Sequence, residues 1–312
     1  MHPYHIPVMT KEVIHYLDCK PGKIYADCTI GGSGHAKAIC EKIMPNGILV
    51  GIDQDKDAIE NAKKILFPHL PNIHLFHGNF VNLSEFLLKC NITKVDGIVL
   101  DLGLSLHQID SSKRGFSFKN TEPLDMRMNT DSDINAGNLI NKLDEVNLWK
   151  LIRDYGEEPW ARNIARNIVK ARKDCEIKTN AELVKIISDS IPKKIQYKQK
   201  IHPATRVFMA LRIAVNNELE RLSEFMDNVA DLLNPEGRLC VLTFHSLEDR
   251  IVKQKIREME KECVCPPNFP KCICNKIKLV RAVNKKAIAP GKEETDINPM
   301  ARSAKLRVAE RI

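Results

Sequence analysis

A glycine-rich turn near the start of the chain constrains the fold more than any other feature. The turn reads Asp27-Cys28-Thr29-Ile30-Gly31-Gly32-Ser33-Gly34-His35 and lies between a strand-like run and a helix-like run. Glycines at such a turn let the backbone approach a ligand where a side chain would collide. A carboxylate at the end of the next strand, Asp53, can accept hydrogen bonds from ribose hydroxyls. The turn therefore predicts a site for a ligand that carries a nucleoside.

The order of residues in this turn distinguishes between nucleoside cofactors. A dinucleotide-binding turn reads G-x-G-x-x-G and holds a pyrophosphate at a helix N-terminus, whereas this turn reads D-x-x-x-G-x-x-G-H. Asp27 would repel a pyrophosphate, but it suits a cofactor with cationic amino and sulfonium groups. We therefore expect S-adenosylmethionine rather than NAD. The alternative is a tight turn that needs its glycines only for conformation, because short glycine motifs often occur by chance.

Strand-like and helix-like runs alternate after the turn. In order, the sequence predicts a strand over 47–53, a helix capped by Asp55, a strand over 72–76, a helix over 83–88 and a strand over 95–101. This alternation implies a parallel sheet covered by helices on both faces, which is a doubly wound, Rossmann-like α/β fold. Ligands bind such sheets at the carboxyl ends of the strands, where Asp27, Asp53 and Asp101 would converge.

The alternation stops after Asp101. About a hundred residues of helical character follow, and then a helix over 217–233, a turn at Pro235-Glu236-Gly237 and a fifth strand over 238–244. We predict that residues 109–215 form an inserted all-helical domain. Residues 1–108 and 216–312 would together form the sheet domain.

Positive charge is concentrated in the inserted segment. The formal net charge of the chain is +8, and residues 159–215 contain thirteen Lys or Arg against four Asp or Glu. At helical spacing, one face of a helix would carry Arg162, Arg166, Lys170 and Lys173. Such a stripe can be an ordinary solvated helix face, but the local excess of charge favours contact with the phosphates of a nucleic acid.

Four of the ten cysteines occur as two close pairs, Cys263-Val264-Cys265 and Cys272-Ile273-Cys274. Four thiolates in two pairs could bind one Zn²⁺ tetrahedrally, although paired ligands usually have two or more residues between them. The alternative is a Pro-rich loop with reduced or redox-labile thiols. The other six cysteines are scattered singly, as buried free thiols often are.

The chain has 312 residues, of which 43% are hydrophobic and 28% charged, so it can bury a sizeable core and is long for one domain. It contains no apolar run of about 18 residues, and Met1 to Thr10 lacks the layout of a signal peptide. We therefore expect a cytoplasmic protein without a membrane partner. The sequence leaves open whether the protein forms an oligomer.

Several longer motifs are specific enough to identify a family. They are Arg114-Gly115-Phe116-Ser117-Phe118, Pro123-Leu124-Asp125-Met126-Arg127-Met128, Tyr155-Gly156-Glu157-Glu158, His202-Pro203-Ala204-Thr205-Arg206, the run from Phe244 to Lys253, and the run from Asn298 to Arg307. In this combination and order the chain resembles the MraW/RsmH family from His5 to Arg311. The resemblance implies a class I methyltransferase sheet and S-adenosylmethionine-dependent methylation of N4 of a cytidine in the decoding region of 16S ribosomal RNA.

The resemblance also implies a set of cofactor contacts, which are Ser33, Gly34, His35, Asp53, Phe80, Asp101 and Gln108. The chain departs from the family where the turn usually reads Gly-Gly-His and here reads Ser33-Gly34-His35. It departs again where a Ser-Ser-Pro-Gln stretch is replaced by Ser105-Leu106-His107-Gln108. Neither change removes a carboxylate or Gln108.

The chemistry limits which residues can be catalytic. Cytosine N4 is a poor nucleophile because its lone pair is delocalised into the ring, so an acceptor must hold its N–H groups and turn the lone pair towards the methyl carbon. Placement then does most of the work. We expect Asp101 to be this acceptor, with Ser105 and Asp125 as further candidates.

Three other side chains have two interpretations each. His245 would face the flipped base at the end of the fifth strand, or it merely packs while Ser246 caps the next helix. Arg127 and Arg206 could bind phosphate, or they could pair with Asp125 and Glu157 respectively. The structure can distinguish these interpretations through the partners of each side chain.

The target nucleotide must be unstacked to reach the site, which favours single-stranded or loop RNA. Recognition of ribosomal shape would make the assembled small subunit the working substrate, rather than naked 16S ribosomal RNA. Two other classes of function stay open. A nicotinamide-dependent oxidoreductase would need a turn compatible with a pyrophosphate, and a noncatalytic RNA-binding or assembly protein would need only the basic insertion.

Overall fold

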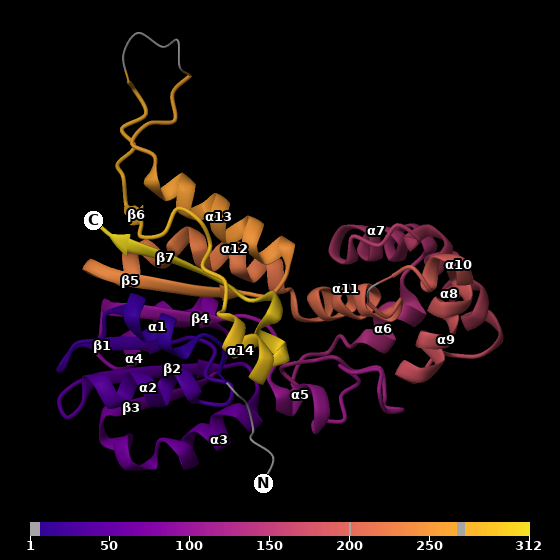
Figure 1. Ribbon diagram of the computed structural model, residues 1–312, viewed down its shortest axis with the longest axis horizontal. Helices are drawn as coiled ribbons and strands as arrows, with labels where there is room; N and C mark the ends of the chain where they lie inside the picture. Colours follow the sequence, from indigo (N-terminus) through magenta and orange to yellow (C-terminus); the bar gives the residue numbers. More distant parts are fainter. Residues whose placement is uncertain (1–6, 200, 267–271) are drawn as a thin grey trace. The chain divides into compact units, whose positions relative to one another are not determined.

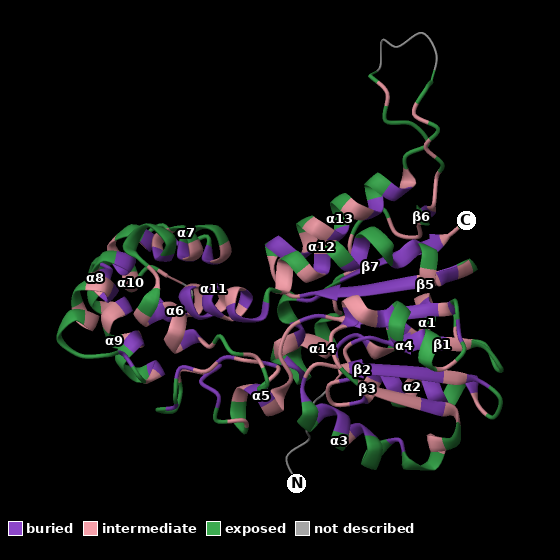
Figure 2. Cartoon of the chain, turned by 180° about the vertical axis from the view of Figure 1, so that it is seen from behind, coloured by how far each residue is buried: buried purple, intermediate pink, exposed green. Residues whose placement is uncertain are grey.

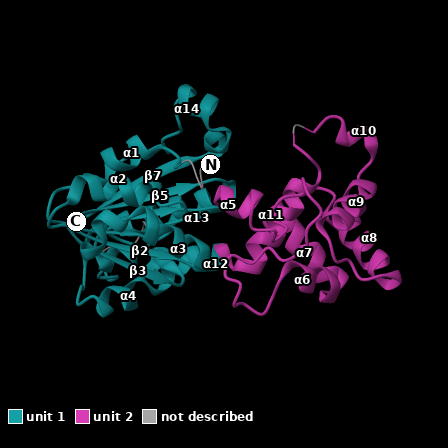
Figure 3. Cartoon of the chain, turned by 90° about the horizontal axis from the view of Figure 1, so that it is seen from below, with its two compact units in different colours: residues 1–103, 219–312 teal, residues 104–218 magenta. Residues whose placement is uncertain are grey.

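The computed structural model describes residues 7–199, 201–266 and 272–312. The chain folds as two compact units, one formed by Met1–Gly103 with Leu219–Ile312 and the other by Leu104–Glu218 (Figure 3). The boundaries predicted from the sequence are 108/109 and 215/216. Ser105 and Gln108 therefore belong to the second unit and not to the sheet unit.

The first unit is built on a seven-stranded sheet with the order β3-β2-β1-β4-β5-β7-β6 (Figure 1). The strands are β1 (Ile24–Asp27), β2 (Ile48–Asp53), β3 (Ile73–His77), β4 (Val95–Asp101), β5 (Leu233–Thr243), β6 (Val280–Ala282) and β7 (Lys305–Arg311). The first five are parallel, whereas β7 runs antiparallel to β5 and β6. The strand order reverses direction between β1 and β4, and ligands of open α/β sheets bind at such a reversal.

Helices cover both faces of this sheet. The helices of this unit are α1 (Thr10–Leu17), α2 (Gly34–Ile43), α3 (Lys56–Ile65), α4 (Leu83–Lys89), α12 (Glu218–Asn228), α13 (Ser246–Glu260) and α14 (Lys292–Ile297), with short 3-10 helices at Phe67–Asn72, Phe80–Asn82, Val229–Leu232 and Pro299–Ser303. The last of these α-helices, α14, has no buried residue and belongs to neither core. One core lies between the sheet and α4, α12 and α13, and the other between the sheet and α1, α2 and α3.

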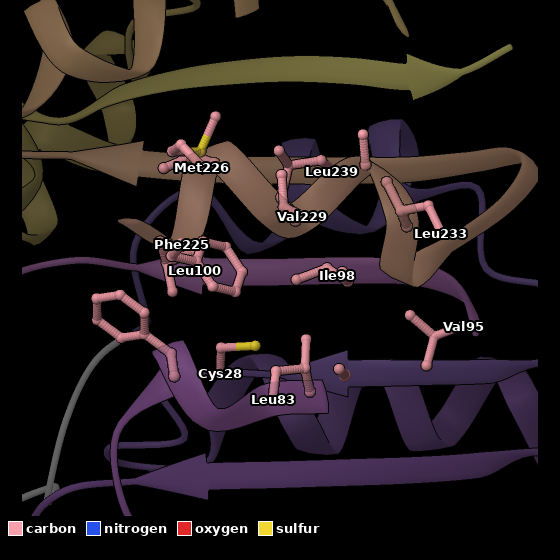
Figure 4. Close-up of a cluster of buried hydrophobic side chains, with 14 of the residues drawn as sticks. Cys28, Leu83, Val95, Ile98, Leu100, Phe225, Met226, Val229, Leu233 and Leu239 are labelled. Carbon is pink, nitrogen blue, oxygen red and sulfur yellow. The ribbon is translucent and has the colours of Figure 1, made fainter. Parts of the chain in front are cut away.

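Successive side chains along the buried strands point to opposite faces of the sheet, so each strand contributes to both cores. In β4, Ile98 and Leu100 face one core while Val99 faces the other. Figure 4 shows Leu100 beside Phe225 of α12, and Ile98 and Met226 belong to the same buried cluster. The strands are buried along much of their length and the outer faces of the helices are exposed (Figure 2). The doubly wound sheet predicted from the sequence is confirmed.

Strand β5 and the helix before it differ from the sequence prediction. Strand β5 begins at Leu233, five residues before the predicted start at Arg238. Leu233 pairs with Val95 and Arg238 with Gly97, so the predicted turn at Pro235-Glu236-Gly237 is an irregularity within the strand. The helix predicted over 217–233 ends at Asn228.

Strands β6 and β7 have no counterpart in the sequence analysis. The strand β7 has charged residues at buried positions, which hides its apolar pattern. Glu310 of β7 pairs with Arg238 of β5 at 2.6 Å, and Arg307 of β7 donates to Asp249 of α13 at 2.7 Å. These ion pairs explain how a strand with two charged, largely buried side chains is accommodated.

The second unit is helical and has a core of its own. Its helices are α5 (Leu106–Asp110), α6 (Ala136–Lys142), α7 (Glu145–Gly156), α8 (Ala161–Asp174), α9 (Asn180–Ser190), α10 (Lys193–Gln196) and α11 (Ala204–Asn216). The only extended pairing among its described residues is an isolated bridge between Pro123 and Thr179. Within the described residues of both units, no helix is long and apolar enough to cross a membrane.

Candidate functional site

The structure brings four of the predicted site residues to one edge of the sheet. Asp27, Asp53 and Asp101 are the last residues of β1, β2 and β4, and these strands are adjacent and parallel. His245 lies two residues past the end of β5, which pairs with β4. This edge also carries the strand-order reversal, so it is the candidate ligand site of the first unit.

Hydrogen bonds connect the glycine turn to β2 and to the end of β4. The Ile30 N–H donates to the Ile52 carbonyl at 3.0 Å, which ties the turn to β2. The Asp101 N–H donates to Thr29 Oγ1 at 2.6 Å, which ties it to the end of β4. Thr29 is a site residue that the sequence analysis missed, because a threonine after a strand carries no distinctive signal. Through these bonds the turn positions the strand ends around it.

Two glycines in the turn are required for different reasons. Gly31 has φ of +42°, a left-handed conformation that residues with a side chain rarely adopt. Gly34 has an ordinary φ, but a Cβ there would lie 2.5 Å from Pro7 Cγ. The first glycine is therefore required for its backbone conformation, and the second lets Pro7 pack against the start of α2.

Asp53 connects the turn to the end of β2. One carboxylate oxygen accepts the Gly31 N–H at 2.8 Å and the other accepts the Asp55 N–H at 2.8 Å. Each oxygen has a second lone pair, so the carboxylate can still accept from ribose hydroxyls. Burial raises the pKa of Asp53 to about 7, and the two backbone hydrogen bonds oppose this shift only in part.

Asp27 lies beneath the turn, with only 1% of its surface exposed. Its carboxylate accepts the Thr29 N–H at 3.2 Å. Burial raises the pKa of Asp27 to about 6, against the opposing charge of His35. Asp27 was predicted to attract a cationic cofactor. Its position also gives it a structural role, because it holds the turn through this hydrogen bond.

His35 and Asp101 form a buried pair at the centre of the edge. His35 Nε2 lies 3.4 Å from an oxygen of Asp101, and the two side chains are 4% and 11% exposed. Burial by itself would lower the pKa of His35, but the hydrogen bond and charge of Asp101, with the charges of Asp27 and Glu294, raise it. The histidine thus lies directly against the carboxyl group of Asp101 and helps to fix its orientation.

Phe80 follows β3 and belongs to the core. It is 8% exposed and packs edge to face on Phe225, with the ring centroids 5.3 Å apart. Only a small part of the ring is therefore available to a ligand. Beside it, Gln54 Oε1 accepts from Asn79 and from Arg221 at 3.2 Å each, and the sequence analysis missed this polar group at the ends of β2 and β3.

His245 is fixed by the helix that follows it. Helix α13 begins at Ser246, so His245 and not Ser246 occupies the N-cap position. Glu248 accepts the N–H groups of Phe244 and His245 at 2.8 and 3.3 Å, and its other oxygen lies 3.0 Å from His245 Nε2. The predicted cap at Ser246 is therefore wrong, and Glu248 is the residue that orients the histidine.

In the second unit, Ser105 and Gln108 form the capping box of α5. Ser105 Oγ accepts the Gln108 N–H at 3.2 Å, and Gln108 Oε1 accepts the Ser105 N–H at 3.0 Å. The S-x-x-Q spacing is the sequence signature of this motif. Both residues were predicted only as site residues, although their spacing also predicts the start of a helix.

Asp125 and Arg127 pair with each other. Arg127 donates to both oxygens of Asp125, at 2.7 and 2.8 Å, and to the carbonyls of Thr130 and Ser132. This fork lowers the pKa of Asp125, although partial burial opposes the shift. Of the two interpretations of Arg127, the structure supports the internal ion pair.

The family motifs of the second unit bond to one another. The Met126 N–H donates to the Arg114 carbonyl at 2.8 Å, and the Arg114 side chain donates to the Met128 carbonyl at 3.0 Å. Asn216 at the end of α11 accepts the Met128 N–H and donates to the Met126 carbonyl, both at 2.8 Å. These contacts explain the motifs over 114–118 and 123–128 as parts of one scaffold.

The predicted basic stripe is on α8. Its four cations, Arg162, Arg166, Lys170 and Lys173, are all exposed, whereas Ile164 and Ile168 on the same helix are buried. Their side chains therefore share the solvent face of α8. This is the geometry that a phosphate-binding surface requires.

Arg206 of α11 pairs with Glu158 at 3.6 Å, not with Glu157 as the sequence analysis expected. Glu158 is buried, and the two residues line a cavity of about 310 Å³ together with Gln199, Ile201, His202 and Pro203. The ring of His202 stacks on Phe118 with centroids 4.6 Å apart. The cavity thus combines a cation, a buried carboxylate and an aromatic wall.

Comparisons with known proteins show the family of the chain. The sequence pattern of the MraW methylase family matches residues 2–312. A protein of Desulforapulum autotrophicum named ribosomal RNA small subunit methyltransferase H is 52% identical over 99% of this chain and 99% of that protein. A protein of the same name from Clostridium botulinum is 47% identical over the same shares. A solved rRNA methylase from Streptococcus thermophilus shows a weaker likeness, with 9% identity and a TM-score of 0.42 over 97% of this chain and 93% of that one.

Proposed function

Because the chain belongs to the MraW methylase family, we propose that it is an S-adenosylmethionine-dependent methyltransferase that modifies N4 of a cytidine in the decoding region of 16S ribosomal RNA. The observation that carries the proposal is the full-length match to relatives named small-subunit rRNA methyltransferases, together with the acidic edge of the sheet. The base and its place in the RNA rest on the motif resemblance.

The acidic edge fits the proposed cofactor. Asp53 has lone pairs for two ribose hydroxyls, and Ser33, Gly34 and His35 are placed at the start of α2 beside it. The carboxyl groups of Asp27 and Asp101, at the ends of adjacent strands, favour a cationic ligand over a pyrophosphate. When bound, S-adenosylmethionine supplies a methyl group activated by its positive sulfonium. Phe80 and Gln108 are proposed contacts from the resemblance.

Asp101 is the proposed acceptor for the cytosine amine. A carboxylate that accepts an N4 N–H weakens the delocalisation of the nitrogen lone pair and turns it towards the methyl carbon. His35 holds this carboxylate in place from within the sheet unit. The methylated nitrogen loses its proton only as it becomes cationic, so no strong base has to act first.

His245 is the second residue that we propose to face the base. Glu248 fixes its ring at the same edge as Asp101. Ser105 and Asp125 are weaker candidates, because the hydroxyl of Ser105 caps α5 and the carboxylate of Asp125 is held by Arg127. Replacing either residue should therefore disturb the fold of the second unit before it disturbs chemistry.

We propose that RNA binds the basic face of α8, with Arg206 as a further phosphate contact. The target is unpaired or loop RNA, because a stacked base cannot reach a strand-end carboxylate. The working substrate would be the assembled small ribosomal subunit in the cytoplasm. Phosphate contacts of this kind make affinity fall steeply with salt.

Replacement of Asp101 with Asn tests the catalytic proposal. The substitution preserves shape but presents an amide N–H₂ to the cytosine amine, so methyl transfer should fall by at least a hundredfold, about 3 kcal/mol in activation free energy. Turnover is measured at saturating cofactor, because Asp101 is also a proposed cofactor contact, and thermal unfolding is measured in parallel to show that the fold is intact. Turnover within tenfold of the unmodified protein would remove Asp101 from the mechanism.

A further inference from the structure

A cluster of four thiols lies in the segment that connects α13 to β6 in the first unit (Figure 1). The cluster consists of Cys263, Cys265, Cys272 and Cys274, whose Sγ atoms all lie within 4.8 Å of one another. We propose that these four residues form a structural zinc site that orders this segment. The proposal concerns a site apart from the acidic edge and does not depend on the proposed function.

The sulfur positions fit one tetrahedral ion. Cys272 Sγ lies 3.4 Å from Cys263 Sγ, 3.5 Å from Cys274 Sγ and 4.0 Å from Cys265 Sγ, and Cys263 Sγ lies 3.8 Å from Cys274 Sγ. With Zn–S bonds of about 2.3 Å, the edge of a ZnS₄ tetrahedron is about 3.8 Å. The observed distances scatter around this value.

The same distances argue against other uses of four cysteines. In a multi-iron cluster the thiolates bind different irons, so their sulfur atoms are farther apart than the ligands of a single ion. Carboxylate-preferring ions such as Mg²⁺ and Ca²⁺ do not select sulfur ligands. A set of four thiolates in tetrahedral geometry is the donor set that is typical of structural zinc.

Backbone N–H groups explain how the short Cys-x-Cys spacing works. The N–H of Val264, between the first two cysteines, donates to Cys274 Sγ at 3.4 Å. The N–H of Ile273, between the other two, donates to Cys265 Sγ at 3.5 Å. The backbone N–H in the middle of each Cys-x-Cys pair thus donates a hydrogen bond to the second cysteine of the other pair. Such donors orient metal ligands and spread the negative charge of thiolates, as outer partners do in known metal sites.

The described residues of this segment have few other contacts that would hold its shape. Its described residues between Glu260 and Val280 form no helix or strand, and Val264, Ile273 and Ile277 are 56%, 67% and 68% exposed. Its base is closed by the Leu279 N–H, which donates to the Met259 carbonyl at 2.9 Å. Burial of apolar side chains therefore contributes little beyond that base. Binding of one metal ion can supply the missing folding free energy.

Other cysteines of the chain provide the contrast. Cys28, Cys40 and Cys240 are buried in the apolar cores of the sheet unit. Cys175, in the second unit, is exposed and does not belong to the four-thiol cluster. Among the described cysteines, only the four residues near the end of α13 combine full or partial exposure, close pairing in sequence and mutual contact. Replacement of Cys175 is therefore the matched control for the replacement of a zinc ligand, because it removes one exposed thiol outside the cluster.

The test is the metal content of the full-length protein, purified without chelator. Inductively coupled plasma mass spectrometry should find close to one zinc per chain. An organomercurial that titrates thiols should release the zinc as the four cysteines react. Cys263→Ser and Cys272→Ser should each lose most of the zinc, whereas Cys175→Ser should retain it. One iron per chain in place of zinc would overturn the identity of the ion.

Two further measurements keep the proposal falsifiable if a variant folds poorly. Cobalt added to the reduced, metal-stripped protein should give the intense visible and charge-transfer bands of tetrahedral Co²⁺ bound to thiolates. Removal of the metal should make the chain sensitive to trypsin at Lys261, Lys276 or Lys278 while thermal unfolding of the sheet unit changes little. Reduced protein that takes up neither zinc nor cobalt, or cysteines isolated as stable disulfides without metal, would refute the site.

Discussion

The protonation of Asp53 should control the affinity of the protein for S-adenosylmethionine. Burial raises the pKa of Asp53 to about 7, and its two oxygens already accept the N–H groups of Gly31 and Asp55. Ribose hydroxyls would use the remaining lone pairs. A proton on the carboxyl group would replace one acceptor with a donor, so the cofactor should bind the ionised form.

The size of the effect follows from that pKa. If only ionised Asp53 binds the cofactor, the dissociation constant at pH 6 is about ten times that at pH 8, and it rises about tenfold for each further unit of acidity, or about 1.4 kcal/mol. At pH 7, binding should release about half a proton. The change Asp53→Asn should remove this pH dependence. At pH 8 it should also weaken binding by about 1.5–3 kcal/mol, because charge-assisted hydrogen bonds are lost.

Isothermal titration calorimetry at pH 6, 7 and 8 measures these quantities for the unmodified protein and for Asp53→Asn. Asp55→Asn is the matched control, since Asp55 caps α3 through a hydrogen bond from the Asp57 N–H and Asn caps as well as Asp. Its affinity at pH 8 should match that of the unmodified protein. Its pH dependence should persist but move to lower pH, because the charge of Asp55 contributes to the raised pKa of Asp53. The reasoning is refuted if Asp53→Asn binds with full affinity at pH 8, or if it keeps the same dependence on pH.

Two other changes test the buried acid beneath the turn and the basic face of α8. Asp27 has a pKa of about 6 in the folded protein and about 3.9 when unfolded, so its stabilising contribution is complete below the unfolded value and is lost as pH rises through 6. Between pH 5 and pH 8 the free energy of unfolding of the unmodified protein should therefore fall by about 1–2 kcal/mol more than that of Asp27→Asn. Urea titrations at the two pH values measure this difference. If they show none, the burial of this carboxyl group is contradicted. The double change Arg166→Ala and Lys170→Ala should weaken RNA binding and lower the slope of log affinity against log salt by about one to two, measured by filter binding. The control is the double change Lys63→Ala and Lys64→Ala, which removes two positive charges from α3. If this control weakens RNA binding as much as the α8 variant does, α8 is not the RNA contact.

Local patterns in the sequence predicted the first half of the sheet well. The strand β4 was predicted with both ends correct, and Asp55 caps α3 as expected. These features depend on apolar runs and capping residues that are close in sequence. The carboxyl ends of parallel strands share one edge by geometry, so the meeting of Asp27, Asp53 and Asp101 also followed from topology alone.

Features that depend on distant partners were not predictable in this way. The strand β7 contains Arg307 and Glu310, whose partners Asp249 and Arg238 are about sixty or more positions away. Likewise, the preference of Arg206 for Glu158 over Glu157 depends on which carboxylate faces α11. Local spacing identifies the candidates for such contacts, and only the folded chain selects among them.

One measurement tests the central claim most directly. The protein is incubated with methyl-labelled S-adenosylmethionine and small ribosomal subunits that lack the modification, and the nucleosides of the 16S ribosomal RNA are then separated. The account predicts label in N4-methylated cytidine at about one site per subunit, and none with Asp101→Asn. Tight cofactor binding without label in the RNA, or label in a different nucleoside, would contradict the assigned substrate.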